Sequence, residues 1–185
     1  MSQRLGVVLA GGAGRRMGRT KGDLVVDGRP LAERAARALA PVCASVLISV
    51  APGAVNPAPN WPAVEDAPPG GRGPLAGLQA AFLGAANADL VVLACDYPAV
   101  TTDLLRAILA QARADADLVF PTDPKGRDHP LVGLWRRPAL EEIEASLASK
   151  IYKVRALLAG LEVQRIHPSA LPGFDLAELL ENMNA

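Results

Sequence analysis

The sequence is poor in the residues that build disulfide frameworks, metal clusters and nucleophilic triads. Its 185 residues include only two cysteines and two histidines. Cys43 and Cys95 lie far apart and show no Cys-x-x-Cys spacing, which argues against a cysteine metal cluster and favours a reduced compartment. No Ser/His/Asp or Cys/His set is evident. Covalent catalysis is therefore not expected.

An excess of one charge and long apolar runs are also lacking. Lys and Arg number 19, and so do Asp and Glu, so no overall field attracts nucleic acid or an anionic membrane. The first apolar run, Leu5 to Ala10, is too short for a signal-peptide core or a membrane span. We expect a cytoplasmic protein that binds neither nucleic acid nor membranes, with any basic site confined to one locality.

Apolar runs alternate along the chain with segments of helical periodicity, without an internal repeat. Strands are expected at 5–10, 45–50, 63–66, 89–95, 117–120, 131–135 and 161–166, and helices at 30–40, 74–85, 101–114, 138–148 and 154–159. Asp27-Gly28 predicts a tight turn, and the proline-rich segment 51–62 predicts an exposed loop. This alternation predicts a single α/β domain over 1–185, a three-layer Rossmann-like fold whose mostly parallel sheet has helices on both faces.

The segment after the first strand carries the strongest chemical signal. Between Gly11 and Lys21 it contains four glycines and four cations. Glycine lets backbone N–H groups approach phosphate oxygens, and the cations neutralise their charge. Met17 stands where a dinucleotide fingerprint needs glycine, and Thr20-Lys21-Gly22 does not match a Walker loop. The segment therefore predicts a nucleoside triphosphate site of another kind.

At the same edge of the sheet, Asp96 ends the most apolar strand. A carboxylate that faces a triphosphate fits a Mg²⁺ site, because this cation is bound by one or two carboxylates together with substrate phosphates. Lys21 is the candidate for stabilising charge that develops on the α-phosphate and on the leaving pyrophosphate. Ligands of such sheets bind beyond the carboxyl ends of the strands, where both residues are expected.

Three motifs resemble those of a known family. Leu9, Ala10, Gly11, Gly12, Arg16, Met17, Gly18 and Lys21 match the nucleotidyltransferase signature Leu-Ala-Gly-Gly-x-x-x-Arg-Met-Gly-x-x-Lys. Cys95-Asp96-Tyr97-Pro98 resembles the family's Cys-Asp-x-Pro motif, and residues 73–77 resemble its Gly-Pro-Leu-Ala-Gly segment. Within this superfamily the chain is most similar to the molybdenum cofactor guanylyltransferases, which implies a nucleotidyltransferase fold and GMP transfer from GTP to the terminal phosphate of molybdopterin.

The resemblance also assigns residues. It implies catalytic roles for Lys21, Arg16 and Asp96, with Asp96 as the Mg²⁺ ligand. The nucleotide site it implies comprises Leu9, Ala10, Gly11, Gly12, Arg15, Lys21, Ser49, Asp66, Gly73, Gly77 and Asp96. Ser49 stands where the family often has asparagine. The pterin side is expected to include Asp128, His129, Asn182 and Asn184 by resemblance, and Lys153 and Arg155 as cations for the acceptor's phosphate.

Three alternatives remain open. A molybdopterin cytidylyltransferase usually has Leu-Ala-Ala-Gly, whereas Gly11-Gly12 here favours guanine by resemblance. Sugar-phosphate nucleotidyltransferases usually have Thr-Arg-Leu and Pro-Lys motifs, which this chain lacks. A non-catalytic GTP-binding module is the third, although Lys21 and Asp96 are both present. The expected partners are GTP and molybdopterin, with transient contacts to cofactor-biosynthesis or acceptor proteins.

Overall fold

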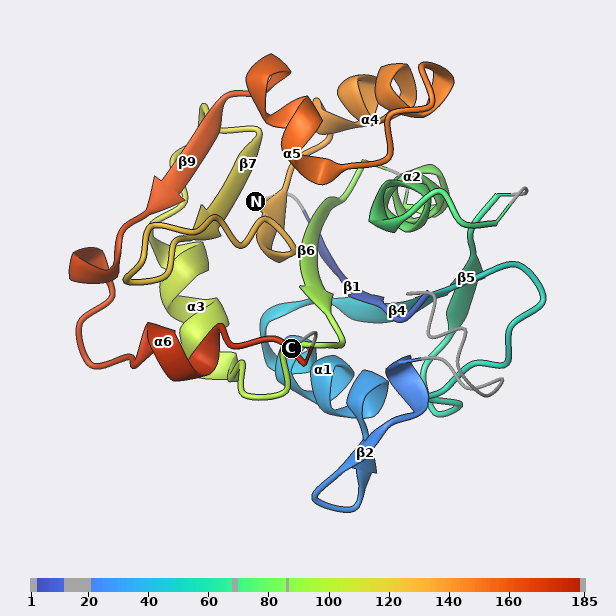
Figure 1. The fold of residues 1–185 in the computed structure, drawn as a ribbon, viewed down its shortest axis with the longest axis horizontal. Coiled ribbons are helices and arrows are strands. Elements are labelled where there is room, and N and C mark those ends of the chain that lie inside the picture. Colours follow the sequence, from blue (N-terminus) through green and yellow to red (C-terminus); the bar gives the residue numbers. More distant parts are fainter. Residues whose placement is uncertain (1–2, 12–20, 68–69, 86, 184–185) are drawn as a thin grey trace.

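The computed structural model describes residues 3–11, 21–67, 70–85 and 87–183. Its centre is a seven-stranded sheet in the order β5-β4-β1-β6-β8-β7-β9, with helices on both faces (Figure 1). The strands of this sheet are β1 (Arg4–Leu9), β4 (Ser45–Val50), β5 (Ala63–Glu65), β6 (Asp89–Ala94), β7 (Leu118–Pro121), β8 (Val132–Trp135) and β9 (Val163–Ile166). Strand β8 runs antiparallel to β6 and β7, while the remaining pairs are parallel. The predicted mostly parallel α/β fold is confirmed.

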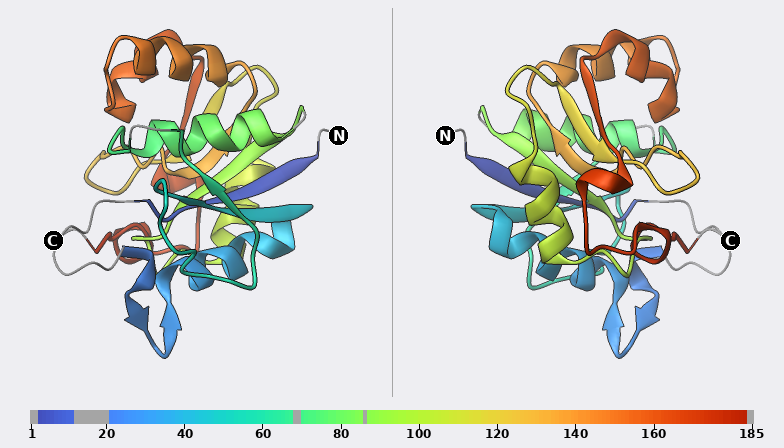
Figure 2. Two further views of the ribbon diagram at one scale, coloured as in Figure 1. Left: turned by 90° about the vertical axis from the view of Figure 1, so that its right-hand side faces the viewer. Right: turned by 90° about the vertical axis from the view of Figure 1, so that its left-hand side faces the viewer.

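The helices form one layer on each face of the sheet, as the two side views in Figure 2 show. They are α1 (Leu31–Leu39), α2 (Pro74–Gly84), α3 (Thr102–Ala110), α4 (Ala139–Ala148), α5 (Val154–Leu157) and α6 (Leu176–Leu179), with 3-10 turns η1 (Lys21–Asp23), η2 (Ala40–Val42), η3 (Leu158–Gly160) and η4 (Pro168–Ala170). Helices α1, α3 and α6 bury apolar side chains against one face, and α2, α4 and α5 against the other. None of the helices in the described ranges is long and apolar enough to cross a bilayer.

The central strands are apolar on both sides because both faces are covered. Val7 and Val8 point to opposite faces of the sheet and are both fully buried. Helix α1 buries Leu31, Ala35 and Leu39, the stripe expected for one covered helix face. The fold thus brings the carboxyl ends of β1, β4 and β6 to one edge of the sheet, and this edge carries the candidate site.

The predicted tight turn is confirmed in a small hairpin outside the main sheet. Its strands are β2 (Val25–Val26) and β3 (Arg29–Pro30), joined by Asp27 and Gly28. Both turn residues have positive φ values, 49° and 76°, as a two-residue hairpin requires. The hairpin projects from the α1 side of the molecule (Figure 2), and Arg34 of α1 anchors it by donating to the Asp27 carboxylate at 3.2 Å.

The structure corrects the expected end of the third helix. Helix α3 ends at Ala110 rather than at Ala114. The guanidinium of Arg136 donates to the carbonyl oxygens of Arg113, Ala114 and Ala116 at 2.7–2.8 Å. These carbonyls are thus satisfied without a helix. Arg136, which is distant in the sequence, thus holds the segment that follows α3, a contact that local periodicity does not reveal.

The proline-rich loop 51–62 was expected to be exposed, and this is wrong for its middle. Ala58 is 1% exposed and Pro57 is buried. Asn56 closes the loop, since its side-chain oxygen accepts from the Ala58 N–H and its amide donates to the Trp61 carbonyl. The loop packs against Gly22, where a Cβ atom would lie 2.8 Å from Pro57 Cγ. It thereby supports the turn that carries Lys21.

Candidate active site

A pocket of about 270 Å³ lies at the carboxyl ends of β1, β4 and β6. This is the location that parallel α/β sheets use for ligands. Its walls come from every nucleotide-site segment that the sequence predicted and the structure describes. The lining residues are Leu9, Gly11, Lys21, Ser49, Ala51, Asp66, Gly71, Gly73, Pro74, Gly77, Ala94, Cys95, Asp96 and Leu131.

Lys21 and Asp96 meet in this pocket. Lys21 Nζ lies 3.8 Å from Asp96 Oδ2, and the side chains are 30% and 17% exposed. Strand pairing explains the approach: β6 lies beside β1 in parallel register, so the segments that follow both strands emerge at one edge. The separation exceeds hydrogen-bond length, so the two groups interact as opposite charges. A cation and a carboxylate side by side can face phosphate oxygens and a metal ion respectively.

Asp66 and Ser49 form a second polar pair on the β4 side. Ser49 Oγ donates to Asp66 Oδ1 at 2.9 Å, and Ser49 is 2% exposed. Burial raises the pKa of the Asp66 carboxyl, while the Ser49 hydrogen bond and the charge of Arg72 oppose the increase. The structure thus directs the Ser49 hydroxyl at Asp66, which fixes the orientation of a carboxylate that lines the pocket.

Glycines let the backbone approach this pair. A Cβ atom at Gly77 would lie 2.2 Å from Ser49 Oγ and 3.2 Å from Asp66 Oδ1, so α2 reaches β4 only because residue 77 has no side chain. At Gly11 a Cβ atom would lie 3.5 Å from Asp66 Oδ2. Gly73, which precedes α2, has a φ of 67°, a conformation that favours glycine. Gly77 therefore has a packing role in addition to its place in the pocket wall.

The donor set at this edge fits a hard divalent cation held largely by its substrate. In the ranges that the structure describes, no three His, Cys, Asp or Glu side chains are grouped to hold a metal. Asp96 supplies one carboxylate, which agrees with Mg²⁺ sites that take their other ligands from phosphates and water. The neighbouring thiol is not a ligand of this type, because burial, reinforced by the charge of Asp96, raises the pKa of Cys95 to about 12.

Asp23 is a residue of this corner that sequence reasoning missed. Its charge acts on the Cys95 thiol together with those of Asp96 and Lys21, so a second carboxylate belongs to the same electrostatic environment. Asp23 lies two residues after Lys21, in the turn η1. The segment Lys21-Gly22-Asp23 was the available signal, but only the fold of η1 brings it to the end of β6.

Other predicted residues are distributed differently. Leu9 and Gly11 line the pocket, whereas Ala10 is 1% exposed and faces the core beside Gly22. Four further predicted residues, Gly12, Arg15, Arg16 and Asn184, lie outside the described residues.

None of the pterin-side candidates that the structure describes lines this pocket. Lys153 and Arg155 are exposed, at the start of α5. Asp128 forms a bidentate ion pair with Arg165 of β9, with nitrogen to oxygen distances of 3.0–3.2 Å. Asn182 hydrogen-bonds to Tyr97, directly after Asp96 in the chain. Asn182 is therefore the member of this group that lies near the end of β6.

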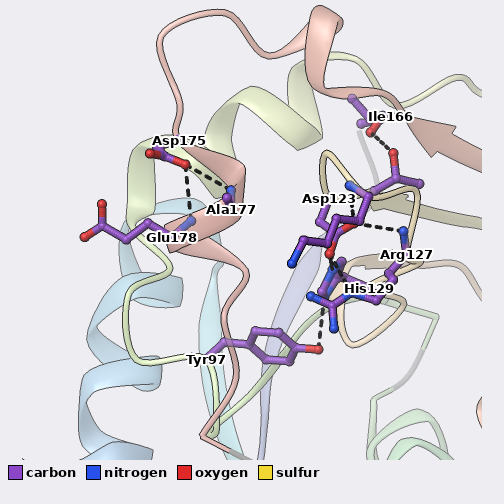
Figure 3. Close-up of polar contacts among 10 residues, drawn as sticks. Tyr97, Asp123, Arg127, His129, Ile166, Asp175, Ala177 and Glu178 are labelled. Carbon is purple, nitrogen blue, oxygen red and sulfur yellow. Dashed lines mark hydrogen bonds and ion pairs between the residues drawn. The ribbon is translucent and has the colours of Figure 1, made fainter. Parts of the chain in front are cut away.

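His129 is buried in a polar cluster beside the site. It is 5% exposed, with Tyr97 Oη 3.2 Å from its Nδ1 and Asp123 Oδ2 3.6 Å from its Nε2 (Figure 3). Burial lowers the pKa of His129, although the charge of Asp123 opposes this. Burial alone would raise the pKa of Asp123, but hydrogen bonds from Arg127 and Lys125 lower it to about 2. The cluster therefore pairs a neutral imidazole with an ionised carboxylate.

Comparisons with known proteins agree with this geometry. The family described as MobA-like NTP transferase domain matches residues 6–166. A Mycobacterium tuberculosis H37Rv protein named "Probable molybdenum cofactor guanylyltransferase" is 34% identical over 167 residues, which cover 87% of this chain and 82% of the relative. The Mycobacterium marinum protein of the same name is 35% identical over the same coverage.

Two solved structures share the fold. Molybdopterin-guanine dinucleotide biosynthesis protein A from Archaeoglobus fulgidus superposes with a TM-score of 0.77 at 24% identity, covering 98% of this chain and 92% of that one. A 2-C-methyl-D-erythritol 4-phosphate cytidylyltransferase from Thermus thermophilus gives a TM-score of 0.61 at 20% identity, covering 94% and 96%. At these identities the likeness establishes a common architecture.

Proposed function

The chain belongs to the family of MobA-like NTP transferases, and we propose that it transfers GMP from GTP to the terminal phosphate of molybdopterin, which carries the molybdenum. The products are the guanine dinucleotide form of the cofactor and pyrophosphate. The observation that carries the proposal is the 3.8 Å approach of Lys21 and Asp96 in a pocket at the carboxyl edge of the sheet. The relatives named molybdenum cofactor guanylyltransferase supply the choice of substrates.

In the proposed reaction an oxygen of the pterin's terminal phosphate attacks the α-phosphorus of GTP. A new P–O bond forms while the bond from the α-phosphorus to the bridging oxygen breaks, and the electron pair leaves with pyrophosphate. Negative charge therefore grows on the bridging oxygen. Lys21, which lines the pocket, would neutralise this charge. The protein contributes position and charge rather than a covalent intermediate, as the neutral, buried Cys95 thiol also suggests.

Family members generally use a divalent metal, and we propose Mg²⁺ for this chain. Asp96 would hold it, and the bound cation would supply charge neutralisation at the phosphate oxygens. Asp66, oriented by Ser49 and flanked by Gly11 and Gly77, is the proposed nucleoside contact. The proposal also includes a cytoplasmic location and transient transfer of the product to acceptor proteins. Residues 1–185 would act as one nucleotidyltransferase domain.

The test supplies the purified protein with Mg²⁺ and molybdopterin, adds each nucleoside triphosphate in turn, and follows pyrophosphate release. We expect release with GTP. Release with CTP alone would instead identify a cytidylyltransferase. Release only when a sugar phosphate replaces the pterin would identify a sugar-phosphate nucleotidyltransferase. GTP binding without any release would indicate a non-catalytic module.

The Asp96→Asn variant tests the metal ligand. It should lose pyrophosphate release while its circular dichroism spectrum and urea midpoint stay close to those of the wild type, because Asp96 is partly exposed at a strand end. Asp115→Asn is the matched control, since this carboxylate is 75% exposed and forms an ion pair with Arg113 at the surface. Full activity of Asp96→Asn would refute the metal role.

A further inference from the structure

His129 is more deeply buried than a side chain that contacts a ligand directly would be. The ring is 5% exposed, and protein groups occupy the positions next to both nitrogens: Tyr97 at 3.2 Å and Asp123 at 3.6 Å. The rings of Tyr97 and His129 also meet edge to face, with centroids 5.7 Å apart. A side chain enclosed in this way has little surface left for a substrate, so its effect must pass through its neighbours.

The charges of the cluster set the direction of its hydrogen bonds. Asp123 accepts from the backbone N–H groups of Lys125 and Arg127 and from Arg127 Nε, at 2.7–2.9 Å, and an ionised carboxylate can only accept. His129 Nε2 lies 3.6 Å from Asp123 Oδ2, beyond hydrogen-bond length, so these two groups interact electrostatically, while Nδ1 lies within hydrogen-bond distance of the Tyr97 hydroxyl at 3.2 Å. The Tyr97 oxygen in turn accepts from the Asn182 side-chain amide. Each group thus fixes the orientation of the next.

The far end of this series reaches the candidate active site. Tyr97 follows Asp96 directly, and the backbone N–H of Met183 donates to the Asp96 carbonyl at 2.9 Å. The segment that contains Asn182 follows α6, which is anchored by the buried Leu176 and Leu180. Figure 3 shows Tyr97, His129 and Asp123 linking the β6 end to the 123–129 loop. Three segments distant in the sequence therefore meet at the residue after Asp96.

We propose that Asp123, His129 and Tyr97 form a positioning series that holds the 181–183 segment, with Asn182, against the end of β6. His129 is then a positioning residue for the acceptor side of the site and does not contact the pterin. The proposal gives His129 a role different from the pterin contact that the sequence predicts. The effect on turnover rests on the proposed function, whereas the effect on the 181–183 segment does not.

The first experiment measures the segment directly, without substrates. Tyr97→Phe removes only the hydroxyl, and amide hydrogen exchange is followed in peptides that cover 176–183. The loss of one hydrogen bond should accelerate exchange there by roughly fivefold to tenfold. Tyr152→Phe, which removes the hydroxyl of the chain's other tyrosine, is the matched control and should exchange at the wild-type rate. Equal rates in Tyr97→Phe and the wild type would overturn the proposal.

The second experiment separates positioning from general structural damage. In Tyr97→Phe and His129→Leu, kcat/KM for molybdopterin should fall by roughly tenfold, while KM for GTP stays at the wild-type value. His129→Asn, which keeps a polar group near the Nδ1 position, should recover part of the loss. His167→Asn, at the chain's other and exposed histidine, is the control and should behave like the wild type.

The outcomes distinguish the two proposals. A wild-type protein that releases no pyrophosphate with any nucleotide would refute the proposed function, while the exchange experiment would still decide the positioning role. Equal losses for GTP and molybdopterin would mean that the cluster supports the fold generally, which would overturn the positioning role. A double variant, Tyr97→Phe with His129→Leu, should be no worse than His129→Leu alone, because both act through one series.

Discussion

The sharpest prediction concerns Gly77, where one added methyl group would disturb both the packing of α2 against β4 and the Ser49–Asp66 pair of the pocket. In Gly77→Ala the new Cβ atom would lie 2.2 Å from Ser49 Oγ and 3.0 Å from Leu9 Cδ2. The backbone of α2 is packed against β4 and cannot easily move away. The Ser49 side chain must therefore rotate and give up its 2.9 Å hydrogen bond to Asp66. The variant should therefore lose stability and misplace the pocket carboxylate together.

The expected size follows from three contributions. Overpacking a close contact costs about 1–3 kcal/mol, and loss of the buried Ser49 hydrogen bond costs about 1–3 kcal/mol. The higher helix propensity of alanine returns about 1 kcal/mol. We expect the free energy of unfolding of Gly77→Ala to fall by about 1–5 kcal/mol.

Urea denaturation measures this change, and KM for GTP measures the displacement of Asp66. Gly84→Ala is the matched control in the same helix, because a Cβ atom there meets nothing within 4 Å. It should be neutral or stabilising by up to about 1 kcal/mol. Adding Ser49→Ala to Gly77→Ala should cost less than the sum of the single changes, since the nearest clashing atom is gone. A Gly77→Ala protein with wild-type stability and wild-type KM for GTP would refute the argument.

Two further predictions concern charges. Lys21→Met should lower kcat about 100- to 1000-fold in single-turnover assays, as expected for a lost transition-state cation. Its stability should change by no more than about 1 kcal/mol, because the pair with Asp96 is partly exposed; unchanged kcat would contradict the role. The depressed pKa of Asp123, about 2 against an ordinary 3.8, stabilises the folded protein above pH 4, and this stabilisation is lost as the pH falls towards 2. Since Arg127 is 63% exposed, solvent screening limits the loss to about 1–2 kcal/mol. Urea unfolding at several pH values should show this slope, and Asp123→Asn should flatten it; an equally steep slope in the variant would exclude Asp123 as the cause.

The sequence alone predicted the elements that depend on local chemistry. Apolar runs identified the central strands, Asp27-Gly28 identified the hairpin turn, and helical periodicity identified α1 because one face must be covered. The segment that ends at Lys21, and Asp96 at the end of a strand, indicated a nucleotide site, because in a parallel sheet the carboxyl ends of neighbouring strands share an edge. Their approach within 3.8 Å agrees with that expectation.

Tertiary structure decided what depends on partners distant in the chain. Arg136 donates to three carbonyls of the segment that follows α3 and holds that segment in its non-helical path. Packing against Gly22 buries the middle of the proline-rich loop. Asp128 pairs with Arg165, and His129 is enclosed by Tyr97 and Asp123. Sequence patterns report local propensity and the side of an element that faces the core, whereas the partner of a buried polar side chain is set only when distant segments pack together.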